Sequence, residues 1–161
     1  MIFLRTTFVT ALGCALMAGV FFAFSTAVMP ALARIQPSQG IAAMNSMIAA
    51  VYNGWFMGAM FGTAALCFGL IVAGIVQRQQ SGAWLIVAGS VIYLLGSIAT
   101  TAAFNEPLND ALARVTPDAA EAGAVWSRYL AEWTAWNHVR AGTCLLAAAL
   151  QMAGMLMRHL V

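Results

Sequence analysis

Residues 77–82, Gln-Arg-Gln-Gln-Ser-Gly, form a short polar break between two apolar runs, residues 52–76 and 83–103. Each run reaches the ~20 mostly apolar residues that a helix needs to cross a bilayer. Backbone N–H and C=O groups find no water in lipid, so each run is predicted to satisfy them internally as an α-helix. A connection this short forces the two helices to run antiparallel. The sequence therefore predicts a transmembrane helical hairpin at its centre.

Two more runs have spanning length, residues 7–29 and 139–157. The first exceeds the ~7 to 15 apolar residues of a signal-peptide core, so we interpret it as a helix of the protein. The whole chain is 63% hydrophobic and only 7% charged, a composition outside the range of soluble globular proteins. We expect residues 1–161 to form one membrane domain, an all-α integral membrane four-helix bundle.

The two long connections, residues 30–51 and 104–138, lie on the face opposite the short turn and are predicted to form helical caps. Pro30 is expected to end the first transmembrane helix, because a proline inside a helix removes one hydrogen bond and clashes with the preceding turn. Residues 41–48 are expected to lead directly into the second transmembrane helix, which would then begin outside the bilayer.

The second cap is predicted to hold a short helix that starts at Pro107 and is capped by Asn105 or Glu106. From Pro117 the pattern stays helical to the C-terminus. At ~1.5 Å per residue such a helix is longer than the bilayer is thick, so its first half should lie outside the hydrocarbon or the helix should bend.

Arginine placement predicts the orientation. The face that holds both termini carries Arg5, Arg78 and Arg158 close to helix ends and no acidic residue. The positive-inside rule then predicts a multi-pass protein of the inner or plasma membrane with both termini in the cytoplasm. The chain has no lysine and a net charge of +2, which excludes a nucleic-acid binder with its clustered basic surface.

Cysteine and histidine give little sign of a metal or redox centre. Cys14, Cys67 and Cys144 lie singly in separate apolar runs, as expected for small packing residues. His138 and His159 are 21 residues apart on one predicted helix, about 30 Å by helical rise, and cannot share a metal ion. No glycine-rich phosphate loop is present either. We expect neither a metal nor an organic cofactor.

Small residues repeat every four positions in the second helix, at Gly54, Gly58 and Gly62. Such ridges let a neighbouring helix approach closely. We favour packing inside the bundle, with a homo-oligomer seam as the alternative. Gln151, the one amide deep in the last helix, is expected to form an interhelical hydrogen bond.

Residues 133–140, Trp-Thr-Ala-Trp-Asn-His-Val-Arg, are the densest polar and aromatic run at any predicted membrane boundary. Polar groups are costly in or near hydrocarbon, so their convergence predicts a functional site. The alternative is a structural cap, with tryptophans as an interfacial belt and the arginine extended toward water. Other polar residues on the same face are Ser25, Asn45, Asn53, Asn105 and Asn109.

Helical geometry limits which of these side chains meet. At about 100° per residue, Asn137 is central on a stripe with Trp126 and Trp133, whereas His138 and Arg140 project about 160° apart. Either a wide pocket surrounds the helix or only one of the two faces it. We favour the wide pocket, because the long caps could cover it.

Five groups of aromatic, polar and proline-containing residues follow one another along most of the chain. They are Phe21-Phe22-Ala23-Phe24-Ser25, Val28-Met29-Pro30-Ala31-Leu32, Asn53 to Phe56, Asn105-Glu106-Pro107-Leu108-Asn109, and Trp126, Tyr129, Trp133 and Trp136 followed by Asn137-His138-Val139-Arg140. Together these motifs resemble the anthrone oxygenase family of small membrane proteins. Ile48 stands where the resemblance leads us to expect an asparagine.

The resemblance implies oxidation of an anthrone-like aromatic by dioxygen without a metal or organic cofactor. In this interpretation His138 is the base, since its ordinary pKa of about 6.5 suits proton transfer near neutrality. Arg140 with Asn137, Asn105 or Asn109 would stabilise the oxyanion. The remaining predicted substrate-binding residues are Trp126, Trp133, Trp136, Asn53 and Ser25.

Two other classes of function stay open at this point. One is a non-catalytic membrane module that binds a quinone or a lipid, or a subunit of a larger membrane assembly. The other is a small transporter, which should place ionisable groups at mid-membrane rather than at one end.

Overall fold

The computed structural model describes residues 2–116 and 118–159, and within them the chain is an all-α bundle. Four helical stretches are long and apolar enough to cross a membrane: Ile2–Leu32, Gly54–Val76, Ala83–Ala113 and Ala122–Arg158. Their elements in chain order are α1 (Ile2–Ala23), η1 (Phe24–Val28), α2 (Met29–Leu32), α3 (Pro37–Val51), α4 (Gly54–Val76), α5 (Ala83–Tyr93), η2 (Leu94–Ala99), η3 (Thr101–Asn105), α6 (Glu106–Ala113) and α7 (Ala122–His159).

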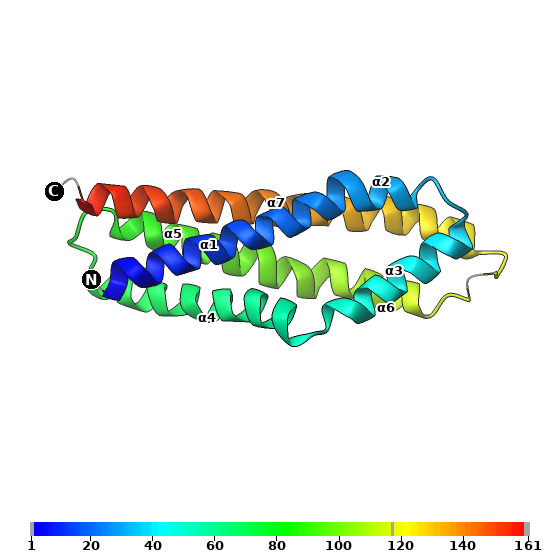
Figure 1. The fold of residues 1–161 in the computed structure, drawn as a ribbon, viewed down its shortest axis with the longest axis horizontal. Coiled ribbons are helices and arrows are strands. Elements are labelled where there is room, and N and C mark those ends of the chain that lie inside the picture. The colour runs from blue at the N-terminus through cyan, green and yellow to red at the C-terminus, as the bar shows by residue number, and fades with distance from the viewer. Residues whose placement is uncertain (1, 117, 160–161) are drawn as a thin grey trace.

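The polar turn joins α4 and α5 as an antiparallel pair, and both termini lie at the same end of the bundle as this turn (Figure 1). Gly82 has a φ of 74°, a left-handed conformation that favours glycine. A Cβ at Gly82 would lie 2.1 Å from the backbone oxygen of Gly154 on α7. Arg158 fastens the turn further by donating to the backbone oxygen of Ser81 at 3.2 Å and to Oε1 of Gln77 at 3.1 Å.

Pro30 and Pro107 lie inside continuous helices, so the helix end expected at Pro30 and the helix start expected at Pro107 are both wrong. Each proline follows a π-helical segment, η1 before Pro30 and η3 before Pro107. The wider turns of a π segment re-route backbone hydrogen bonds near a residue that cannot donate one. Asn105 is helical and makes no capping hydrogen bond. Helices therefore extend beyond the predicted spans at the cap end.

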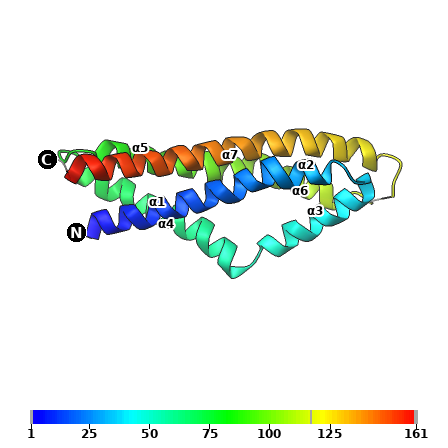
Figure 2. The same ribbon diagram turned by 45° about the horizontal axis from the view of Figure 1, so that its top comes forward.

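The expected direct entry into the second transmembrane helix is also wrong, because the chain turns sharply between α3 and α4 (Figure 2). Asn53 begins α4, and its side-chain oxygen accepts hydrogen bonds from the backbone nitrogens of Trp55 at 2.9 Å and Phe56 at 3.0 Å. These are the hydrogen bonds that an N-cap asparagine typically accepts. The break makes α3 a separate amphipathic helix laid across the cap end.

The last helix is the central packing element. α7 has 38 residues, about 57 Å by helical rise, and it packs along both α1 and α5. The predicted long helix is confirmed from Ala122, while Pro117 and the side chain of His159 lie outside the described residues. Gln151 donates to Ser90 on α5 at 3.2 Å, which confirms its expected interhelical role. The three cysteines are buried and free.

The glycine ridge of α4 does not pack inside the bundle, contrary to our favoured interpretation. Gly54, Gly58 and Gly62 are exposed, and a Cβ added at any of them would meet no other atom within 4 Å. The ridge faces outward on the helix that leans away from the bundle at its N-terminal end (Figure 2).

We predict that Gly82→Ala destabilises the bundle. The left-handed conformation alone costs on the order of 1–3 kcal/mol for a residue with a Cβ, and the new methyl group meets the Gly154 backbone. The measurement is thermal unfolding of the purified protein in detergent. Gly142→Ala is the matched control, because a Cβ at Gly142 meets nothing within 4 Å. Equal unfolding temperatures for the two variants would contradict the prediction.

Candidate functional site

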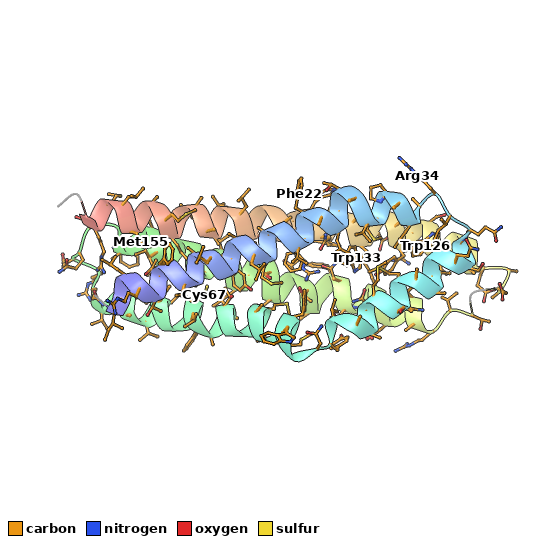
Figure 3. The ribbon with its side chains drawn as sticks, in the orientation of Figure 1. Phe22, Arg34, Cys67, Trp126, Trp133 and Met155 are labelled. Carbon is orange, nitrogen blue, oxygen red and sulfur yellow. The ribbon has the colours of Figure 1, made fainter. Side chains whose placement is uncertain are left out.

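A cavity of about 70 Å³ lies at the cap end of the bundle, lined by residues of α1, α3, α4, α6, α7 and the π-helical turns. Figure 3 shows Trp133 between the ribbons at this end and Phe22 projecting from the outside of α1. Apolar side chains make most of the wall, and a few polar groups converge on it. The polar lining residues are Tyr52, Thr101, Glu106, Asn109, Trp133, Asn137 and Arg140.

Within residues 2–116 and 118–159, Arg140 is a buried cation without an acidic partner. Its side chain is 95% buried, and the guanidinium lies 3.8 Å from the centre of the Phe21 ring, a cation–π contact. Nη1 makes one long contact of 3.5 Å with Oδ1 of Asn137, and Nε has no partner. Among the described residues the ion pair within 4 Å is Arg128 with Glu132, on the exposed surface. The guanidinium thus retains donors facing the cavity.

Asn137 fixes the position of this part of α7. Its Nδ2 donates to the backbone oxygen of Phe21 and to Oγ of Ser25, each at 2.7 Å. With both donors used, Asn137 turns its oxygen toward Arg140. Asn137 therefore orients the guanidinium and ties α7 to the last turn of α1 and to η1.

Glu106 is the cavity's carboxylate, and the sequence analysis interpreted it only as a helix cap. Oε2 accepts a hydrogen bond from the hydroxyl of Tyr52 at 2.9 Å, and Oε1 accepts one from Nδ2 of Asn109 at 3.3 Å. The bond to Glu106 raises the pKa of Tyr52 above its ordinary value, so the phenol remains a donor near neutral pH. The signal that could have found Glu106 is a carboxylate within the matched Asn105–Asn109 motif.

His138 does not reach the cavity, so the wide pocket around α7 is wrong. The side chain is exposed and lies in an outer groove between α1 and α7, beside Gly19 and Phe22. Arg140 points inward because two residues turn a helix by about 200°. Trp136 is half-buried and stacks on Phe104 with ring centres 3.6 Å apart, and it does not line the cavity.

Four other predicted residues support the site without lining it. Asn105 is buried and donates to the backbone oxygen of Trp133 at 3.3 Å. Ser25 accepts from Asn137, and Asn53 is the exposed cap of α4. Trp126 is buried under α3, where a Cβ on Gly40 would lie 2.6 Å from its ring. The structure thus brings Asn109, Trp133, Asn137 and Arg140 to the cavity wall.

The apolar wall was not predicted. It contains four methionines, whose flexible thioethers fill irregular space and adapt to ligands. Pockets for drug-sized ligands start near ~300 Å³, so a ring system can enter only if these side chains move. The apolar lining residues are Val20, Phe21, Phe24, Met44, Met47, Ile48, Val51, Phe56, Met57 and Met60.

Comparison with known proteins assigns the chain to a family. The family model described as anthrone oxygenase matches residues 48–150, more than half of the 161 residues. No curated protein and no solved structure shows significant similarity to the chain. The matched region includes Glu106, Asn109, Asn137 and Arg140. The chain belongs to the anthrone oxygenase family.

Proposed function

We propose that this protein oxidises an anthrone-like, hydroxylated polycyclic aromatic with dioxygen in the cap-end cavity. Glu106 is the base and Arg140 stabilises the developing oxyanion. One observation carries the proposal: a carboxylate and a buried guanidinium line the same cavity and do not pair with each other. Family membership supports the choice of substrate class.

Keeping Arg140 and Glu106 apart costs folding free energy, so the arrangement indicates a functional reason for it. A buried charge without a partner costs several kcal/mol, and closing a salt bridge would recover part of that. Arg140 and Glu106 are instead held more than 4 Å apart, since the structure has no ion pair between them among its described residues. A ligand between them would offer an acceptor to Arg140 and an acidic hydrogen to Glu106.

An anthrone has both features. Its ketone accepts hydrogen bonds, and the methylene group across the central ring carries acidic hydrogens. Removal of one proton by Glu106 gives an enolate whose negative oxygen faces Arg140, a preorganised donor in a mostly apolar cavity. The flat rings would lie among Phe21, Phe56 and Trp133.

The oxidation then balances without an external reductant. The enolate transfers one electron to dioxygen, and the radical pair combines to form a carbon–oxygen bond at the former methylene carbon. The peroxide takes the proton held by Glu106. Glu106 then removes the second methylene proton, the O–O bond breaks, and a ketone forms as hydroxide leaves. Protonation of this hydroxide by Glu106 gives water, so one oxygen atom enters the quinone and the other enters water.

We predict that Glu106→Gln lowers anthrone-dependent oxygen uptake by about 10²–10⁴-fold, the usual contribution of a general base. Gln keeps the shape and an acceptor for Tyr52 but cannot take a proton. Uptake is measured with an oxygen electrode on detergent-purified protein, after subtraction of spontaneous anthrone oxidation. His138→Ala is the control and should retain uptake, because its side chain is exposed outside the cavity. The reverse pattern would restore His138 as the base.

Arg140→Met should separate function from stability. The substitution removes an oxyanion donor, so kcat/KM for anthrone oxidation should fall about 10²–10³-fold. It also removes an unpaired buried charge, so the unfolding temperature in detergent should stay the same or rise. Arg128→Met, at an exposed ion pair, should change neither quantity by much. A large loss of stability with full activity in the folded fraction would contradict the assignment.

A further inference from the structure

We propose that Asn109 is a positioning residue that holds the Glu106 carboxylate toward the cavity by donating a hydrogen bond to it, and that α7 fixes Asn109 in this role. The inference rests on Glu106 being the base of the proposed reaction. Trp133, which the sequence predicts as a substrate-binding residue, acts here together with Tyr129 to set the orientation of an amide.

The direction of the Asn109 amide follows from its neighbours. The indole Nε1 of Trp133 lies 3.0 Å from Oδ1 of Asn109, and an indole nitrogen can only donate. The atom facing it must therefore be the oxygen, which resolves the usual ambiguity between amide oxygen and nitrogen. The hydroxyl of Tyr129 donates to the same oxygen at 2.9 Å. The nitrogen of Asn109 is left to face Oε1 of Glu106, at 3.3 Å.

This amide has little freedom to turn. Asn109 is 91% buried, and the side chains of Tyr129 and Trp133 are at least 95% buried. Their rings lie near-parallel with centres 6.0 Å apart, and Trp126 continues the stack at 5.7 Å from Tyr129. Rotation of the amide would place its NH₂ group against two donors. The aromatic stack on α7 thus fixes the orientation of the Asn109 amide. The Nδ2 of this amide in turn holds the carboxylate of Glu106, one helical turn earlier.

The consequence is electrostatic as well as geometric. An N–H that donates to a carboxylate favours the ionised form, and a neighbouring negative charge disfavours it. The other groups that interact with Glu106 are Tyr52, Tyr129 and Arg140, while Asp110 lies near Tyr52. Only Asn109 and Tyr52 donate to its oxygens among the described residues. Each oxygen keeps a further lone pair for the substrate proton.

The test compares Asn109→Leu and Asn109→Asp with the wild-type protein. Two quantities are measured: the acid limb of the pH–rate profile for anthrone-dependent oxygen uptake, and the infrared carboxyl band that disappears in Glu106→Gln, followed by pH titration without substrate. In Asn109→Leu both midpoints should move to higher pH, as expected for loss of a hydrogen bond to a charged group. In Asn109→Asp they should move further, because a second carboxylate faces Glu106.

Trp133→Phe provides a variant that leaves Asn109 intact. It removes the donor that fixes the amide but keeps an aromatic ring, so both midpoints should move in the same direction by a smaller amount. Trp126→Phe is the control, since Trp126 belongs to the same stack and does not bond to Asn109. It should leave both midpoints unchanged.

The outcomes separate this inference from the proposed function. Unshifted infrared midpoints in Asn109→Leu and Trp133→Phe overturn the positioning role, whatever the activity. If Asn109→Leu does not fold, Trp133→Phe decides on its own. If Trp133 only packs against Asn109 and does not orient its amide, the infrared midpoint of Glu106 in Trp133→Phe will equal that of the wild-type protein. Shifted infrared midpoints with no oxygen uptake in the wild-type protein would support the positioning role and sink the proposed reaction.

Discussion

The separation of Arg140 from Glu106 is the constraint that the cap end of the molecule is built to maintain. Two opposite charges that line one mostly apolar cavity would attract each other into an ion pair unless each were held by other groups. Arg140 is held by the Phe21 ring and by the oxygen of Asn137. Glu106 is held on the other side, with a donor on each oxygen.

The backbone contributes to the same separation through its π-helical segments. η3 ends at Asn105, immediately before Glu106, and η1 includes Ser25, the hydrogen-bond partner of Asn137. A π segment inserts an extra residue into a helical turn and so rotates everything after it, which is why such segments recur at functional sites. Pro30 and Pro107 follow these segments closely. The prolines that looked like helix ends are better understood as parts of the turns that aim side chains into the cavity.

The fold, and which face of α7 is buried, could be predicted from the sequence for identifiable reasons. Spanning helices follow from hydropathy, and the inward stripe of α7 follows from helical periodicity, which predicts the burial of Trp133 and Asn137 that the structure has. Whether His138 or Arg140 faces inward depends on the rotation of α7 against α1, which no local pattern specifies. Glu106 was not predicted as a cavity residue, because a carboxylate beside a proline is typical of a helix start. In the structure η3 leads directly into α6, so no helix starts at this point and no cap is needed.

Helix packing and the cavity lie in different halves of the bundle. Near the termini and through the middle, α7 presents small residues such as Cys144, Ala147 and Ala148 to its neighbours, all fully buried. Close helix approach leaves no room there for a ring system, and the amide of Gln151 is used between helices. At the cap end, the same face of α7 presents tryptophan, asparagine and arginine, and α3 closes over them. Ionisable side chains lining a cavity at one end of a tightly packed bundle suit a site where a ligand enters and leaves on one side. A path through the bundle, as a transporter requires, would need ionisable groups where the small residues pack.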